Sequence, residues 1–128
     1  MKHTGACHCG AVKFEFDSEV SITVFHCNCS ICKMDDFQHL IIPKGDFRLL
    51  TPQSNMSLYR FNQKVAQHYF CRICGIKPWY IPRSNPDGVS VNFRCVDQGS
   101  FDAVQFDNFD GENWEANASV LSHLSDPL

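Results

Sequence analysis

The sequence predicts an all-β fold with at most one or two short helices, and it predicts one domain covering residues 1–128. The chain has 128 residues, of which 44% are hydrophobic and 20% charged, which suits a single core. Short apolar runs rich in β-branched and aromatic residues recur along the chain. Clusters of turn-forming residues separate these runs. Together these observations favour a sandwich-like arrangement of strands.

The strands are expected where apolar and polar residues alternate. Residues 12–17 show this alternation, and residues 20–26 repeat it and lead directly into Cys27. Further strands are expected at residues 39–42, 57–61, 67–70, 77–81 and 89–93. Turn signals occur at residues 43–46, 51–55 and 82–88. The pair Asp87–Gly88 favours a hairpin or bulge, and only the region of residues 112–121 has a weakly helical pattern.

Charge is distributed unevenly along the chain. All 11 Lys and Arg lie in residues 1–94, whereas residues 95–128 carry seven of the 14 acids, and the net charge is −3. We interpret the acidic C-terminal segment, about residues 97–128, as a solvated surface segment. A net-acidic domain without a run of basic residues is a poor nucleic-acid binder, so nucleic acid is an unlikely partner.

The sequence also gives an expectation about location. No apolar stretch is long enough to span a bilayer, and the start of the chain lacks the apolar segment of a secretory signal. We therefore expect a cytoplasmic protein that does not enter a membrane. Cytoplasmic thiols are kept reduced, so the eight cysteines are expected to be metal ligands or redox groups rather than a disulfide framework.

Seven cysteines fall into three groups, and two of these groups predict a closed zinc site. The groups are Cys7 and Cys9, then Cys27, Cys29 and Cys32, then Cys71 and Cys74. Zinc in structural sites takes four ligands, which usually arrive in close pairs from two loops. The first and third groups together supply four sulfurs. Gly10 and Gly75 follow these groups, and a positive φ at each would let backbone N–H groups approach the thiolates.

The middle group predicts a different kind of site. Cys27, Cys29 and Cys32 supply three ligands, which is typical of a catalytic zinc with an exchangeable fourth position. Two zinc ions are therefore expected, one structural and one catalytic. The alternative is that a fourth side chain of the protein closes the second site. The candidates for this role are His26, His39, His68 and Cys95, of which Cys95 is interpreted as a core residue.

The order CxCG, CxCxxC and FCxxCG resembles the family of glutathione-dependent formaldehyde-activating enzymes and centromere-protein-V-like proteins. Residues 29–33, 66–71 and 80–86 are similar to the centromere-protein-V-like branch, and the resemblance runs from about Gly5 to about Trp114. It implies a zinc-containing β-tent fold. It also implies that Cys7, Cys9, Cys71 and Cys74 bind the structural ion and that Cys27, Cys29 and Cys32 bind a second ion tied to activity.

The resemblance implies a carbon–sulfur lyase similar to S-(hydroxymethyl)glutathione synthase, which joins a small thiol such as glutathione to formaldehyde or a related aldehyde. Cations suited to the glutathione carboxylates are Lys33, Arg72, Lys77, Arg83 and Arg94. Asp35 and Asp36 follow Cys32 and are expected to disfavour an anionic peptide there. The alternatives are a non-catalytic zinc-binding module of the centromere-protein-V type and a structural or metal-storage protein. A homodimer is a further option.

Overall fold

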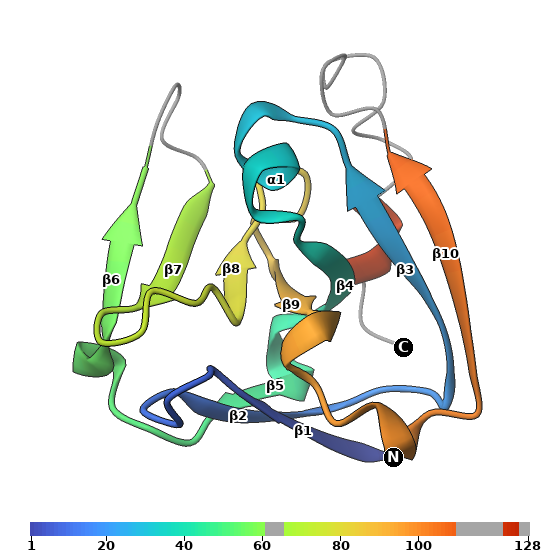
Figure 1. Ribbon diagram of the computed structural model, residues 1–128. Helices are drawn as coiled ribbons and strands as arrows, with labels where there is room; N and C mark the ends of the chain where they lie inside the picture. Colours follow the sequence, from blue (N-terminus) through green and yellow to red (C-terminus); the bar gives the residue numbers. More distant parts are fainter. Residues whose placement is uncertain (61–65, 110–121, 126–128) are drawn as a thin grey trace.

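A computed structural model describes residues 1–60, 66–109 and 122–125, and within them the chain folds into two β-sheets (Figure 1). The small sheet has the strand order β1-β2-β5, with β1 at Lys2–Ala6, β2 at Lys13–Asp17 and β5 at Phe47–Leu49. The large sheet has the order β10-β3-β4-β9-β8-β7-β6. Its strands are β3 (Ser21–Cys27), β4 (Gln38–Pro43), β6 (Met56–Tyr59), β7 (Gln67–Cys71), β8 (Trp79–Ile81), β9 (Gly88–Asn92) and β10 (Ala103–Phe109).

Helical structure in the described residues is limited to short pieces. The α-helix α1 spans Ser30–Asp35. Short 3₁₀ helices occur at Lys44–Asp46, Gln53–Asn55, Phe93–Cys95, Gln98–Ser100 and Ser122–Ser125. Among the described residues, no helix combines the length and the apolar character needed to cross a membrane. The expected all-β class with at most one or two short helices is confirmed, and α1 is the α-helix of the described residues.

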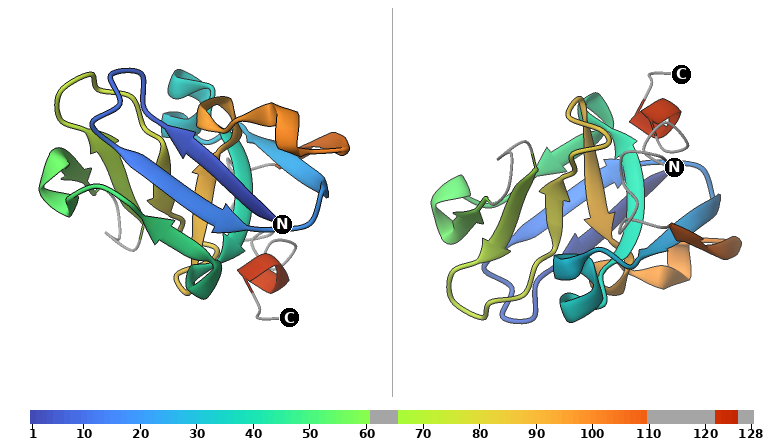
Figure 2. Two further views of the ribbon diagram at one scale, coloured as in Figure 1. Left: turned by 90° about the horizontal axis from the view of Figure 1, so that it is seen from below. Right: turned by 90° about the horizontal axis from the view of Figure 1, so that it is seen from above.

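The small sheet lies across one end of the large sheet, and the main core fills the space between them. Figure 1 shows β1, β2 and β5 below the large sheet, and the view from below shows them crossing in front of it (Figure 2). Phe14 and Phe16 of β2 are fully buried, as their alternation with polar residues predicts. They share one core with Leu40 and Val91 of the large sheet. Packing of β2 against the large sheet therefore joins the two layers.

The large sheet has an apolar face and a polar face. Leu40 pairs with Val91, Val91 with Trp79, and Trp79 with Tyr69, and directly paired residues point to the same side of a sheet. This line of apolar side chains belongs to the core that faces the small sheet. Because side chains alternate along a strand, the neighbouring residues form the opposite face. That face carries His39, Asn92, Ser90, Tyr80 and His68.

The polar face is covered by the segment that contains α1. Phe37 follows the helix, and its ring lies 4.6 Å from that of His39 and 5.1 Å from that of Tyr80. Both partners are buried, at 4% and 6% exposure, although they lie on the polar side of the sheet. The large sheet is thus packed on both sides, and its polar groups must be satisfied within the protein.

The structure confirms most of the expected strands and adds elements that the pattern does not predict. Strands occupy the regions around residues 13–17, 21–27, 38–43, 56–59, 67–71, 79–81 and 88–92, and β8 and β9 form the expected hairpin. The added elements are β1, β5, β10 and α1. Strand β10 runs parallel to β3 inside the acidic segment, so that segment is partly sheet rather than only solvated chain. The helical signal at 112–121 lies outside the described residues.

Candidate metal centres

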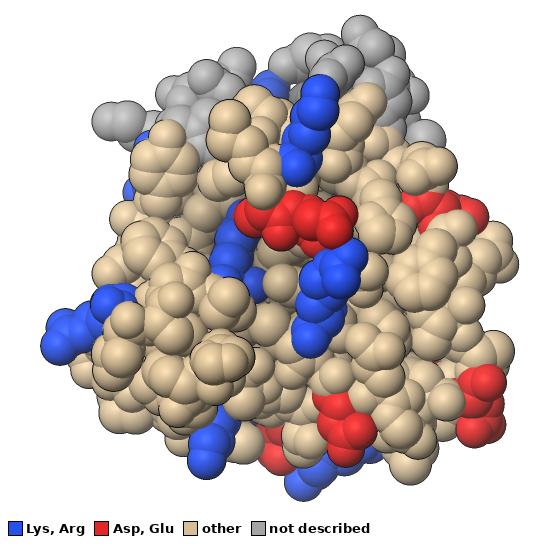
Figure 3. Space-filling view, viewed as in Figure 1, with Lys and Arg blue, Asp and Glu red and all other residues tan. Residues whose placement is uncertain are grey.

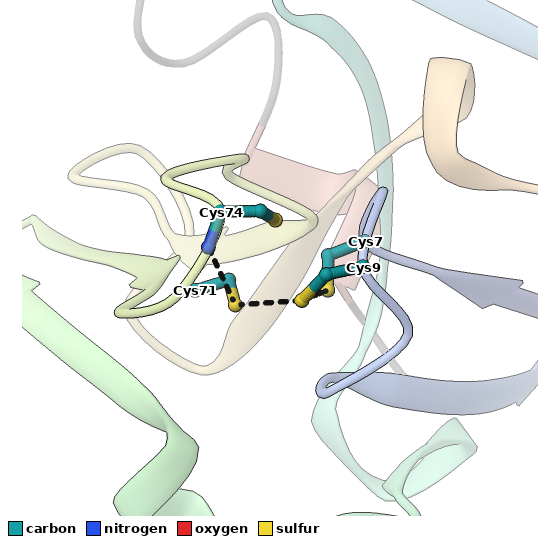
Figure 4. A group of neighbouring side chains, drawn as sticks. All are labelled: Cys7, Cys9, Cys71 and Cys74. Carbon is teal, nitrogen blue, oxygen red and sulfur yellow. Dashed lines mark hydrogen bonds between the residues drawn. The ribbon is translucent and has the colours of Figure 1, made fainter.

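The first and third cysteine groups meet in space. The loop after β1 carries Cys7 and Cys9, β7 ends at Cys71, and the turn that follows carries Cys74. The four side chains come together (Figure 4). The Cys9 sulfur lies 3.7 Å from that of Cys7 and 3.6 Å from that of Cys71. A disulfide needs about 2 Å between sulfurs, whereas sulfurs bound to one tetrahedral zinc at ~2.3 Å are separated by ~3.8 Å. The spacing therefore fits a shared metal ion, and all eight cysteines are free thiols.

Backbone N–H groups point at the sulfurs of this first centre. Gly10 and Gly75 adopt φ values of 81° and 78°, as the sequence predicts for turns of this kind. The N–H of Val12 donates to the Cys7 sulfur at 3.3 Å. Burial opposes ionisation of Cys74, but hydrogen bonds from the N–H groups of Ile76 and Cys9 and from the thiols of Cys71 and Cys9 together lower the Cys74 pKa to about 6. The turns thus stabilise the thiolate form that a metal requires.

The middle cysteine group forms around the end of a strand and a short helix. Cys27 is the last residue of β3, Cys29 is the N-cap of α1, and Cys32 lies in the first turn of that helix. Residues three apart share one side of a helix, so α1 aligns Cys29 with Cys32. Hydrogen bonds from the thiols of Cys27 and Cys32 lower the pKa of Cys29, while hydrogen bonds with Cys27 and Cys29 raise the pKa of Cys32. Ionising all three sulfurs therefore requires a cation.

A histidine lies beside this middle group. The sulfurs of Cys27 and Cys32 and a ring nitrogen of His39 all lie within 4.8 Å of one another. His39 Nδ1 is 3.1 Å from Ser90 Oγ and 3.2 Å from the Tyr80 hydroxyl, whereas Nε2 has no hydrogen-bond partner among the described residues. Burial lowers the pKa of His39 to about 3, so its imidazole is neutral. Such a neutral nitrogen is suited to binding a metal.

The other three candidates for a fourth ligand lie elsewhere. His26 packs its ring against that of Phe106, at 5.7 Å, and His68 Nδ1 lies 2.7 Å from Lys77 Nζ. Cys95 is half-buried, and burial raises its pKa to about 11. It packs at the edge of the main core, in line with its interpretation as a core residue, but it also borders a cavity.

This cavity has a volume of about 560 Å³ and lies between the two cysteine groups. His8 and Gly75 line it on the side of the first centre, and Ile31 and Asp35 of α1 line it on the side of the second. Figure 3 shows a hollow on this face with basic and acidic side chains around it. None of the three cysteines of the middle group belongs to the described wall, but Ile31 precedes Cys32 directly and Asp35 follows it within the helix.

Two of the five candidate cations line the cavity. These are Lys77 and Arg94, whereas Lys33, Arg72 and Arg83 lie outside its described wall. The Lys77 side chain is only 9% exposed. Its Nζ lies 4.0 Å from the centre of the Tyr80 ring and 5.0 Å from that of Phe37. Burial lowers the Lys77 pKa, and the charge of Asp35 opposes this effect.

The two acids after Cys32 are paired with these cations. Asp35 lies 3.6 Å from Lys77 Nζ, and Asp36 lies 2.6 Å from Arg94. Asp36 has a φ of 52°, which turns the chain at the end of α1 and brings its carbonyl oxygen to Arg94 Nε at 3.1 Å. The expected repulsion of an anionic ligand by these acids is therefore reduced by their partners.

The aromatic residues near the cysteine groups divide between core and cavity. Trp79, Tyr80 and Phe93 are buried. Phe70 instead lines the cavity, together with Phe37 and Tyr59. Sequence alternation does not identify these wall residues, because the cavity is formed by loops and strand ends from separate parts of the chain.

The fold and the sites define a class: a two-sheet β protein with two thiol-rich groups suited to a thiophilic metal. The family model for the glutathione-dependent formaldehyde-activating enzyme matches residues 2–114, and the chain belongs to this family. The crystal structure of a Rhodobacter sphaeroides protein is similar, with a TM-score of 0.69 and 31% sequence identity. The match covers 84% of this chain and 100% of that one. The resemblance to the glutathione-dependent formaldehyde-activating enzymes that the cysteine pattern indicates is confirmed.

Proposed function

We propose that the protein joins a small thiol, glutathione, to formaldehyde at the middle cysteine group, in the manner of S-(hydroxymethyl)glutathione synthase. Membership of the formaldehyde-activating family gives the reaction class. The observation that supports the proposal is the cavity of about 560 Å³ beside α1, with Lys77 and Arg94 in its wall. Binding sites for ligands of this size commonly measure ~300–1,000 Å³ and combine apolar walls with a few polar groups.

The proposed reaction is an addition that needs no oxidant. The sulfur of the thiol forms a bond to the carbonyl carbon of formaldehyde while the carbon–oxygen π bond opens. The carbonyl oxygen takes a proton, and the thiol has lost one, so the product is the S-hydroxymethyl thioether and no other group leaves. The reverse reaction breaks the same carbon–sulfur bond, which is why the activity is classed as carbon–sulfur lyase chemistry.

We propose zinc as the metal at both centres. Cys7, Cys9, Cys71 and Cys74 would hold one ion, and the middle group would hold a second. A zinc ion bound at the middle group would lower the pKa of a substrate thiol, so that the thiol reacts as a thiolate. The sulfur spacing in the first centre and the need for a cation near Cys29 and Cys32 support these assignments.

The cavity cations are proposed to hold the carboxylates of glutathione. Lys77 sits over the rings of Tyr80 and Phe37, where little solvent competes for its charge. Arg94 donates from Nε and Nη2 to Asp36, and its guanidinium carries further N–H groups that can donate to a carboxylate. Glutathione carries two carboxylates and one ammonium group, and the wall offers two cations and one acid, Asp35, so the charges are equal in number and opposite in sign.

Lys77→Met provides the test of this proposal. Methionine keeps much of the length and apolar character of the lysine side chain but removes its charge, and Asp35 is then left without its partner. We expect the Kd for glutathione to rise by at least ~10-fold, the effect of losing a charged hydrogen bond. Isothermal titration measures the affinity, and NMR exchange spectroscopy measures formation of the S-hydroxymethyl adduct above the uncatalysed rate.

The matched control is Lys33→Met, which removes the same charge from an exposed residue of α1 outside the described cavity wall. This variant should bind glutathione within ~2-fold of the wild type. Equal weakening in both variants would show a general effect of net charge and would overturn the assignment of Lys77. Absence of any rate above the blank in the zinc-loaded wild type would overturn the proposed activity.

A further inference from the structure

We infer that His39 is the fourth ligand of the middle centre, so that this centre offers three sulfurs and one imidazole nitrogen rather than three sulfurs and an open position. The inference rests on the metal-binding part of the proposed function and is independent of the aldehyde chemistry. It is carried by the strand register, by the hydrogen bonds of the imidazole and by the charge of the centre.

Strand register places His39 at the cysteines. Strand β3 pairs with β4 so that Phe25 lies opposite His39. Cys27 lies two residues beyond Phe25 and therefore on the same face of the sheet. Diagonal neighbours on one face of an antiparallel pair are within reach of long side chains. Helix α1 then brings Cys32 to the same place, which explains why the three donors lie within 4.8 Å of one another.

Hydrogen bonding leaves one ring nitrogen of His39 available. Ser90 and Tyr80 both contact Nδ1, and Ser90 Oγ can accept the proton of this nitrogen. A histidine that binds a metal through one nitrogen usually donates the proton of the other to a neighbouring oxygen, which fixes its orientation. Nε2 is buried and has no hydrogen-bond partner among the described residues, in a side chain only 4% exposed. A metal ion would satisfy it.

A buried Nε2 without a hydrogen-bond partner does not by itself identify a metal ligand, as His3 shows. His3 is 1% exposed, its Nδ1 lies 2.7 Å from Ser100 Oγ, and its Nε2 also has no hydrogen-bond partner among the described residues. Its ring stacks on Phe101 at 4.0 Å, and it belongs to none of the clusters of close metal donors in the described residues. What separates His39 from His3 is the pair of cysteine sulfurs beside it.

The charge of the centre also favours a neutral fourth ligand. Three thiolates around a divalent ion leave one net negative charge, and a fourth thiolate would leave two in a site whose inner side is buried. The imidazole of His39 adds no charge. A substrate thiol must then displace one of the four donors instead of filling a vacancy, so the protein would hold its metal more tightly and the thiol less tightly than an open site would.

The test compares His39→Asn with His3→Asn. The Oδ1 and Nδ2 atoms of asparagine can keep the contact that Nδ1 makes with a serine, but nothing replaces Nε2. Each zinc-loaded protein is titrated with a chromophoric chelator, and each cobalt-loaded protein is examined by visible absorption. We expect His39→Asn to lower the affinity for the second ion by at least ~10-fold and to change the cobalt spectrum. His3→Asn should change neither the affinity nor the spectrum.

Glutathione provides a second readout. In the cobalt-loaded His39→Asn protein, the thiol should alter the spectrum at lower concentration than in the wild type, because no imidazole occupies the position. If the wild type binds two ions and His39→Asn has the same affinities and spectrum as His3→Asn, the inference is wrong and the proposed function stands. If the wild type binds only one ion, the metal part of the proposed function fails, and the inference fails with it.

Discussion

The two cysteine centres differ in what they connect. The first joins residues separated by 62 positions, Cys9 and Cys71, and thereby ties the loop beside the small sheet to the end of β7 in the large one. The second draws on Cys27, Cys29 and Cys32, which lie in one short segment, and its cluster of close donors consists of Cys27, Cys32 and His39 of the neighbouring strand β4. A link between distant residues restricts the unfolded chain far more than a local one does.

The two centres also differ in their donors and surroundings. The first offers four sulfurs, and its turns supply backbone N–H groups to them. The second lies on the polar face of the large sheet, with His39 among its donors and a cavity beside its helix. These differences support a division of roles in which the first centre stabilises the fold and the second carries the proposed chemistry.

The largest expected effect follows from breaking the first centre. Cys71→Ser removes a buried sulfur from the cluster that joins the loop after β1 to the end of β7. If this cluster holds zinc as proposed, we expect the free energy of unfolding to fall by roughly 3–5 kcal/mol, comparable to losing a disulfide in a small domain. Cys32→Ser should cost less than ~2 kcal/mol, because its centre is local in sequence. Urea denaturation of the zinc-loaded proteins measures both values.

Cys95→Ser is the control for this comparison, since Cys95 belongs to neither group of donors. Its unfolding midpoint should lie close to that of the wild type. Equal losses for Cys71→Ser and Cys32→Ser would contradict the division of roles between the centres. Metal analysis of each variant shows whether one ion or two have been lost.

An intermediate effect is expected from the glycine turn of the first centre. Gly75 has a φ of 78°, and a Cβ there would meet no atom within 4 Å, so the cost of Gly75→Ala comes from backbone conformation alone. We expect this variant to lose about 1–2 kcal/mol of unfolding free energy and to bind the first zinc ion more weakly. Chelator competition and urea denaturation measure the two quantities.

Gly45→Ala is the matched control. A Cβ at Gly45 also meets no atom within 4 Å, but this residue does not adopt a positive φ. The substitution should be neutral or slightly stabilising, since alanine restricts the unfolded chain. A loss at Gly45 as large as that at Gly75 would mean that the turn conformation is not what the first centre depends on.

Much of the fold and of the first centre could be predicted from the sequence because their signals are local. The alternation of Phe14 and Phe16 fixes which side of β2 is buried, and the CxCG and CxxCG spacings fix the turns at Gly10 and Gly75. Strand β5 has only three residues, and β10 is an edge strand in an acidic stretch, so neither shows a clear apolar alternation. Their pairing partners lie far away in the sequence.

The surroundings of the second centre could not be predicted in the same way. The sequence identifies Cys27, Cys29 and Cys32, but it gives His39 no advantage over His26 or His68 as a neighbour. Only the register of β4 against β3 brings His39 to the cysteines, and only the register of β9 and β8 brings Ser90 and Tyr80 to His39. Such information depends on long-range pairing, which no short motif encodes.

The smallest expected effect concerns the ion pairs of the small sheet. They test whether charge pairing within this sheet adds to the stability that the first centre gives the fold. Arg48 of β5 donates to Glu15 at 2.8 Å and to Asp17 at 3.0 Å, both on β2. Hydrogen bonds from Arg48 lower the pKa of both carboxyl groups. Lowered pKa values mean that the pairs stabilise the fold above the ordinary carboxyl range, near pH 4–5, and that this contribution disappears as the pH falls through the lowered values.

Arg48→Met should therefore be slightly less stable than the wild type at neutral pH, and the difference should vanish in acid. Loss of zinc at low pH affects both proteins alike and cancels in this difference, which is measured by urea denaturation across the pH range. Lys44→Met removes the same charge from the adjacent turn and should show no such trend. A difference in stability between Arg48→Met and the wild type that persists at low pH would mean that Arg48 acts through packing of its side chain. The stability of the small sheet would then depend on the first cysteine centre and the core rather than on charge.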